Sequence, residues 1–181
     1  MRRAALIVLA LGAASATEAR VFLTQDQALR LAFDGAVVER QARFLTEPQL
    51  ARARELASVE VPSALVARYV ATADGRLVGT AYFDTHVVRT LSETVMIVVG
   101  SDDRILRIEI LAFGEPEDYL PRPRWLAQFP GRALDRDLAL KRGVDAITGA
   151  TLSAQALTDA TRRILALHRV LGEPATPGAS P

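Results

Sequence analysis

The stretch that decides the fold is ALVARYVATADGRLVGTAYFDTHVV, residues 64–88. Its centre, Asp74-Gly75, is a dipeptide typical of tight β-hairpin turns, and apolar residues run on both sides of it. Two further apolar segments follow, residues 93–99 and 105–113, with a short turn of serine and aspartate between them. We therefore predict an antiparallel meander of four strands over residues 64–113.

Helices are expected on both sides of this meander. Thr24 and Thr46 each stand three residues before a glutamine, which is the capping-box pattern that begins a helix. Leucine and isoleucine recur at helical spacing near the end of the chain. The predicted elements are helices over residues 25–34, 47–58 and 151–171 and a strand over 37–45. The order helix, strand, helix, meander, loop, helix predicts an α+β fold.

A proline-rich segment separates the meander from the last helix. Residues 115–130 contain four prolines, with Tyr119 and Trp125 between them. We expect a loop with one short helix at about residues 124–129. Long loops that carry aromatic residues often bind ligands, but a proline-rich cover over one open face of the sheet would have the same composition.

Composition limits the chemistry. The chain has 181 residues, half of them hydrophobic, and 22 basic against 21 acidic residues, so one domain with a real core is expected. The balanced charge gives no reason to expect a nucleic-acid partner. The absence of cysteine excludes disulfides, thiolate zinc sites, iron–sulfur clusters and c-type haem attachment. With only two histidines we predict no metal site, so any redox chemistry would need an organic cofactor.

Both ends of the chain are expected to lie outside the domain. Arg2 and Arg3 precede an uncharged apolar run over residues 4–14, and small residues follow, which predicts a secretory signal peptide over residues 1–16. An uncleaved membrane anchor is the alternative. The remaining chain would form one domain over residues 21–171 and be exported, for example to a periplasm. The tail, residues 172–181, holds three prolines and two glycines and is predicted to be disordered.

The most informative segment, DAITGATLS at residues 145–153, lies where a turn becomes the last helix. Gly149 and Ala150 allow a ligand to approach the backbone closely. Hydroxyl groups stand at Thr148, Thr151 and Ser153. The free N–H groups of a helix start favour a phosphate there, although an ordinary helix start with a glycine turn would look the same.

This segment resembles the flavinylation motif of the FMN-binding domain family, Asp-x-x-(Ser/Thr)-Gly-Ala-(Thr/Ser). Each defined position is filled, by Asp145, Thr148, Gly149, Ala150 and Thr151. The family includes FMN-carrying subunits of the Na⁺-translocating NADH:quinone oxidoreductase and of the Rnf complex. The resemblance implies that a Mg-dependent flavin transferase moves FMN from FAD onto Thr151 as a phosphoester. Asp145 would then orient the segment or assist the transferase, or merely cap a turn.

The resemblance extends upstream, to about residues 64–171. Residues 85–90 with Glu93 look like the early part of soluble members of the family, and the stretch from Phe113 to Gly131 resembles their central loop. That loop lacks the His-x-Glu-Thr-Pro-Gly element of the respiratory-complex members.

Four more residues are candidates for flavin contacts. His86 could touch the flavin or its phosphate, or be an ordinary packed histidine. Arg89 could bind phosphate or the ring edge, or pair with Glu93. Tyr119 and Trp125 could stack on the ring, with burial in the core as the alternative for Trp125.

Together these features predict an exported carrier of covalent FMN that shuttles electrons between redox partners, such as a cytochrome or a membrane oxidoreductase. We expect an electron-transfer flavoprotein more than a stand-alone enzyme. The alternatives are a non-redox binding or sensing module on the same fold, and a subunit of a flavin-dependent reductase.

Overall fold

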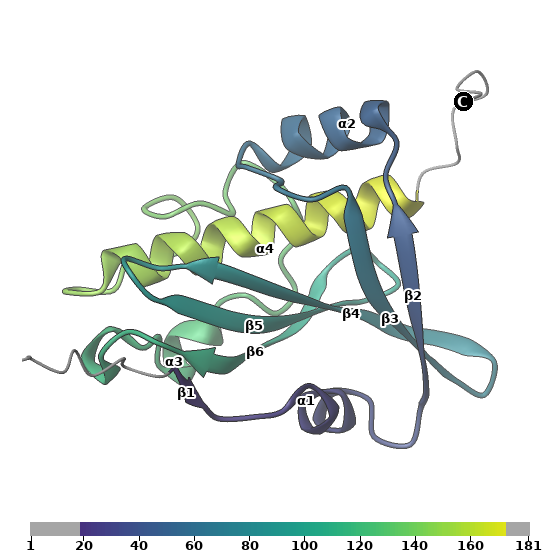
Figure 1. Cartoon of the computed structure of the whole chain (residues 1–181), viewed down its shortest axis with the longest axis horizontal. Helices are drawn as coiled ribbons and strands as arrows, with labels where there is room; N and C mark the ends of the chain where they lie inside the picture. Colours follow the sequence, from purple (N-terminus) through teal and green to yellow (C-terminus); the bar gives the residue numbers. More distant parts are fainter. Residues whose placement is uncertain (1–18, 173–181) are drawn as a thin grey trace, which may run out of the picture.

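The computed structural model describes residues 19–172, which form an α+β domain around one six-stranded antiparallel sheet (Figure 1). The predicted leader, residues 1–16, and all of the predicted tail except Gly172 lie outside the described residues. The strand order is β1-β6-β5-β4-β3-β2. The strands are β1 (Arg20–Val21), β2 (Val37–Phe44), β3 (Leu65–Ala73), β4 (Arg76–Val87), β5 (Ser92–Val99) and β6 (Ile105–Phe113).

The central four strands confirm the predicted meander. Asp74 and Gly75, with φ of 51° and 74°, make the turn between β3 and β4, as the left-handed backbone of a tight hairpin requires. The predicted strand at residues 37–45 is β2, which pairs with β3 at one edge. The short strand β1 was not predicted. It covers part of the opposite edge by pairing with the end of β6.

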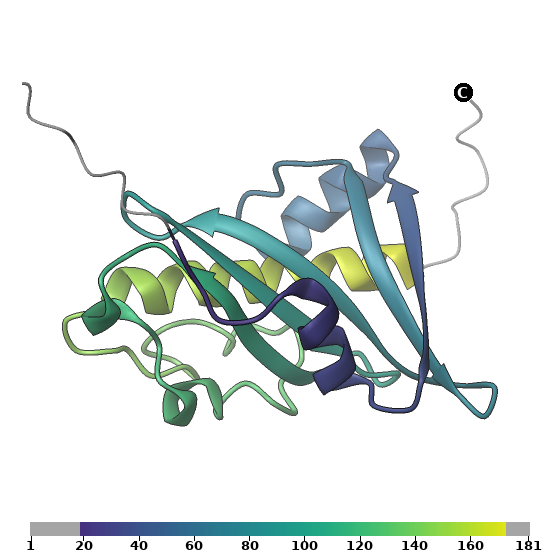
Figure 2. The same ribbon diagram turned by 60° about the horizontal axis from the view of Figure 1, so that its bottom comes forward.

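Helices cover both faces of the sheet. Figure 2 shows α1 on one face and α4, with α2 beside it, on the other. Both capping boxes are present, from Thr24 to Gln27 and from Thr46 to Gln49. The short helix in the loop is shorter than predicted, because Gln128 and Phe129 donate their N–H groups three residues back instead of four. The helices are α1 (Gln25–Ala32), α2 (Glu47–Ala57), α3 (Pro123–Leu126) and α4 (Thr151–Gly172), with a 3₁₀ turn at Glu117–Tyr119.

The middle of the sheet is buried on both faces, and β5 shows this most clearly. Val95, Ile97 and Val99 belong to the larger core beneath α2 and α4, whereas Met96 and Val98 belong to the smaller core beneath α1. A strand covered on both sides needs apolar residues in succession instead of strict alternation. No helix within residues 19–172 is long and apolar enough to cross a membrane.

The connection from β6 to α4 runs over one end of the sheet and positions the motif. Phe129, Leu138 and Val144 of this connection are buried in the larger core. The connection is also fixed to the start of β6, since the N–H of Ile105 donates to the carbonyl of Arg132 over 2.9 Å. The segment therefore covers the sheet, as the second interpretation of its composition predicted, while its other residues reach the site described next.

Candidate functional site

The motif folds as a tight turn followed at once by a helix. The N–H of Ala150 donates to the carbonyl of Ile147 over 3.0 Å, which closes the turn. Gly149 has a φ of 80°, a left-handed conformation that favours glycine. A Cβ placed there would meet nothing within 4 Å, so the turn needs glycine for its backbone and not for space. Thr151 is the first residue of α4 and is exposed.

The start of α4 lacks a side-chain cap. Thr24 and Thr46 cap α1 and α2, but the residue before α4 is Ala150, whose carbonyl accepts from the N–H of Ala154 over 3.1 Å. Within residues 19–172, no acceptor satisfies the N–H groups of the first three helical residues, 151–153. Free N–H groups at a helix start, together with the positive end of the helix dipole, favour an anion at this position.

A cavity of about 250 Å³ opens beside this helix start. It brings together six of the residues singled out in the sequence and adds three others. The lining residues are Val88, Arg89, Glu115, Tyr119, Gly149, Ala150, Thr151, Leu152 and Ser153. The expected alternative for Arg89, an ion pair with Glu93, does not form, because Glu93 contacts His86 instead. Arg89 is exposed at the cavity and has no ion pair within residues 19–172.

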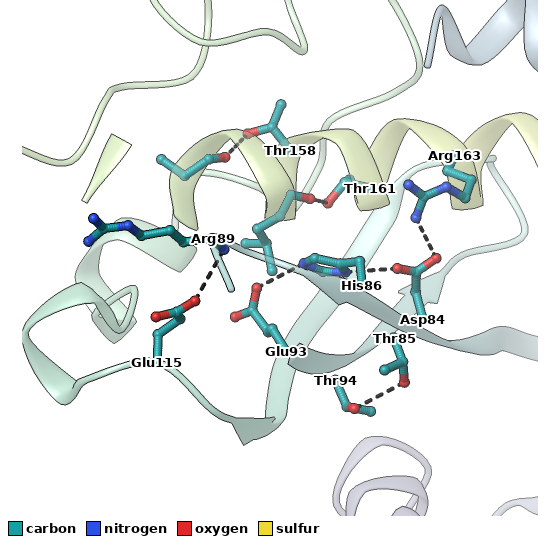
Figure 3. A network of polar contacts seen from close by, with 12 residues as sticks. Asp84, Thr85, His86, Arg89, Glu93, Thr94, Glu115, Thr158, Thr161 and Arg163 are labelled. Carbon is teal, nitrogen blue, oxygen red and sulfur yellow. Dashed lines mark hydrogen bonds and ion pairs between the residues drawn. The ribbon is translucent and has the colours of Figure 1, made fainter. Parts of the chain in front are cut away.

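Glu115 fixes the turn between β4 and β5 that forms one wall of the cavity (Figure 3). Its Oε1 accepts the N–H groups of Thr90 at 2.6 Å, Leu91 at 2.8 Å and Arg89 at 3.2 Å. These hydrogen bonds, led by that of Thr90, hold the pKa of the Glu115 carboxyl below its usual range. From the sequence alone, Glu115 belongs only to the stretch that resembles the family's central loop, because its partners lie about 25 residues earlier in the chain.

We expect Glu115→Gln to loosen this turn. The variant keeps one oxygen acceptor but loses the charge that strengthens three hydrogen bonds, so the free energy of unfolding should fall by about 1–2 kcal/mol at neutral pH. The lowered pKa of Glu115 means that its contribution is present above the unfolded value and is lost as pH falls through the folded one. The difference from wild type should therefore shrink in acid. Urea unfolding at neutral and at acidic pH measures this difference in the free energy of unfolding. Glu117→Gln, on the exposed side of the same loop, is the control. Equal losses of stability in the two variants would contradict the role of Glu115.

His86 does not line the cavity but lies in a buried charged group. Its Nδ1 donates to Oδ1 of Asp84 over 2.9 Å, and its Nε2 donates to Oε2 of Glu93 over 3.0 Å. Arg163 of α4 donates to the other oxygen of Asp84 over 2.7 Å. Of the two interpretations of His86 given above, these contacts agree with a packed, hydrogen-bonded histidine. We refer to Asp84, His86, Glu93 and Arg163 as the charged cluster.

Burial and the contacts within the charged cluster shift the pKa values of His86, Asp84 and Glu93. Burial opposes a charged imidazole, but the hydrogen bonds to Asp84 and Glu93 outweigh it and raise the pKa of His86 to about 9. Burial raises the pKa of Asp84, but its contacts with His86 and Arg163 prevail and lower it overall. For Glu93 burial prevails and raises the pKa, although His86 acts against it. At neutral pH His86 is therefore an imidazolium between two carboxyl groups.

Trp125 and Asp145 are joined to each other outside the cavity. The indole Nε1 of Trp125 donates to the backbone carbonyl of Asp145 over 2.7 Å, and its ring packs edge-on against Phe129 at 5.1 Å between ring centres. The N–H of Asp145 donates to the side chain of Gln128 over 2.8 Å. Trp125 thus holds the first residue of the motif in place, and it does not face the cavity as a stacking residue would. Thr148 is exposed in the turn and does not line the cavity either.

Comparison with known protein families gives a match. Residues 92–166 match the FMN-binding domain family, from the start of β5 into α4. The match includes Glu115, Tyr119 and the whole motif, and it confirms the resemblance over this range. Residues 64–91, with His86 and Arg89, lie outside the match, so their place in the domain stays a prediction. A search of curated proteins found no match.

Proposed function

Because the chain contains an FMN-binding domain over residues 92–166, we propose that it carries FMN attached through the phosphate to Oγ1 of Thr151 and passes electrons between redox partners. The observation that supports this most directly is the position of Thr151. It is exposed at the uncapped start of α4, and it lines the same cavity as Arg89 and Tyr119.

The lining of the cavity offers groups that suit the two parts of FMN. The free N–H groups of residues 151–153 and the cationic side chain of Arg89 suit the phosphate. The half-buried ring of Tyr119 and the exposed side chain of Leu152 offer apolar surface to the flavin ring. The volume of about 250 Å³ is below the range of about 300–1,000 Å³ typical of enclosing pockets. FMN would therefore remain partly exposed, as exchange of electrons with another protein requires.

The chain presents the hydroxyl but does not activate it. Oγ1 of Thr151 donates to the carbonyl of Ile147 at 3.5 Å, and within residues 19–172 it has no hydrogen bond to a side chain that could act as a base. A threonine hydroxyl is a weak nucleophile, so activation would come from a Mg-dependent flavin transferase. Oγ1 would form a bond to the FMN phosphorus of FAD as the bond between the two phosphates breaks. AMP would leave, and the hydroxyl proton would pass to solvent.

When bound, FMN supplies one- and two-electron redox chemistry. The chain's own residues would then hold the phosphate, orient the ring against Tyr119 and keep the turn at Arg89 rigid through Glu115. The basic and apolar leader sequence supports export, so the proposed site of action is the periplasm or its equivalent. A cytochrome or a membrane oxidoreductase is the proposed redox partner there.

Intact mass under denaturing conditions tests the covalent linkage. The protein would be produced with and without a flavin transferase, and only the first sample is expected to gain the mass of one FMN less one water. The yellow protein should then be reduced and reoxidised reversibly. Absence of the gain, while a known substrate of the transferase is flavinylated in the same cells, would contradict covalent attachment. A modified protein whose flavin cannot be reduced would contradict electron transfer.

A further inference from the structure

The charged cluster lies next to the cavity wall, although it takes no part in the proposed binding of FMN. His86 pairs with Glu93 across β4 and β5, and only the pair Val87–Ser92 separates them from the turn that Glu115 holds. Val88 and Arg89 of that turn line the cavity. A change of charge in the cavity would therefore act on the cluster across a single pair of strand residues.

Glu93 is the unusual member of this cluster. Its side chain has 0% exposure, and its Oε2 accepts from His86 over 3.0 Å. Its other oxygen, Oε1, is buried and has no hydrogen-bond partner among residues 19–172. Figure 3 shows this oxygen turned away from His86. A buried polar atom without a partner costs free energy, so Oε1 is the atom of the cluster that can gain a proton without giving up a hydrogen bond.

The charges around Glu93 are nearly balanced. Within the cluster, Asp84 and Glu93 face the two cations His86 and Arg163. The other charged groups on the elements packed nearby are Asp159 and Arg162 of α4, Arg89 of the turn and Glu115 after β6. Because the cluster has no excess positive charge, it can compensate negative charge that is added in the cavity only by binding a proton.

We propose that Glu93 takes up a proton at Oε1 when FMN in the cavity is reduced. The inference rests on the proposed function. Two electrons from an external reductant enter the flavin ring together with one proton, and a second proton from solvent forms an O–H bond at Oε1. Two electrons and two protons thus enter the molecule together, and the uptake at Glu93 offsets the charge left on the flavin. Glu93 acts as a proton acceptor beside the cofactor and need not touch it.

The infrared difference spectrum between dithionite-reduced and oxidised flavinylated protein tests this directly. We expect a new C=O band of a buried carboxylic acid on reduction, which shifts when the protein is labelled with ¹³C-glutamate. The band should vanish in Glu93→Gln, which keeps the shape of the side chain but cannot bind the proton. It should persist in Glu109→Gln, the same change on the α1 face of the sheet. Where the Glu93 variant folds poorly, the labelled wild-type protein still tests the inference, because the absence of a glutamic acid band from its spectrum would overturn it.

The pH dependence of the flavin potential gives a second readout. Each proton taken up with two electrons changes the potential by about 30 mV for a tenfold change in proton concentration. Glu93→Gln should lose one such step, so its potential should vary by about 30 mV less per pH unit than that of wild type or Glu109→Gln. Equal slopes, or a wild-type spectrum without a glutamic acid band, would overturn the inference while leaving a reducible flavoprotein. A protein that binds no FMN would overturn the proposed function as well.

Discussion

Replacing Thr151 by alanine is expected to abolish covalent flavin completely and to leave the fold intact. The substitution removes the hydroxyl at the exposed first residue of α4, where it lines the cavity. Among the described residues, the only hydrogen bond of this hydroxyl is the long one to Ile147, so the free energy of unfolding should change by less than about 0.5 kcal/mol. Intact mass after production with the transferase, and flavin fluorescence on a denaturing gel, measure the loss. Circular dichroism and urea unfolding confirm the fold.

Three further substitutions show whether the position or merely a hydroxyl matters. Thr151→Ser keeps the nucleophile and should retain covalent FMN. Thr148→Ala changes an exposed hydroxyl of the motif outside the cavity, and any FMN still attached to this variant should be found on Thr151. Ser153→Ala removes a hydroxyl that lines the cavity but is buried, and therefore poorly placed for a transferase. If Thr151→Ala remained fluorescent after denaturation and Ser153→Ala did not, Ser153 would be the attachment residue.

The parts of the fold that sequence reasoning predicted correctly depend on neighbouring residues. The hairpin at Asp74-Gly75 follows from two residues that tolerate left-handed backbone, and both have positive φ. Each capping box is a contact between a threonine and the glutamine three residues later. The turn that presents Thr151 depends on Gly149, which the motif itself contains. Such contacts leave a pattern within a few residues, which is what a single sequence can show.

The features that escaped prediction depend on residues far apart in the chain. Arg163 reaches Asp84 across 79 positions, and Glu115 reaches the β4–β5 turn across about 25. No local periodicity indicates such partners. Trp125 was expected either on the flavin or in the core. It is partly buried against the larger core, and the contact that was not predicted is that of its indole N–H with the motif backbone 20 residues later. The strand β1 has two residues, too few for any alternation of apolar and polar positions to be recognised.

The largest expected effect on stability comes from Asp84→Asn. Asp84 accepts from Arg163 with one oxygen and from His86 with the other, and its side chain is only 10% exposed. Asparagine offers one acceptor and turns an N–H₂ group toward the other donor, so either Arg163 or His86 loses its hydrogen bond to this position. Removing one partner of a buried ion pair costs about 3–5 kcal/mol, and we expect a loss near 3 kcal/mol because the amide oxygen keeps one hydrogen bond. Asp102→Asn, at a carboxyl group that is 61% exposed, is the matched control and should change stability by less than about 0.5 kcal/mol.

The pH dependence distinguishes this mechanism from a simple packing defect. The pKa of Asp84 is lowered in the folded state, so its contribution is present above the unfolded value and is lost as pH falls through the folded one. The difference in stability between wild type and Asp84→Asn should therefore narrow in acid.

The pKa of His86 is raised from 6.5 to about 9, so the imidazolium stabilises the wild-type fold fully below 6.5 and loses this effect as pH rises through 9. Without the carboxylate of Asp84 the pKa of His86 should fall, and the alkaline loss should begin at lower pH. An NMR titration of the two imidazole nitrogens follows this shift, and an unchanged titration of His86 in the variant would show that the charged cluster does not set its proton affinity.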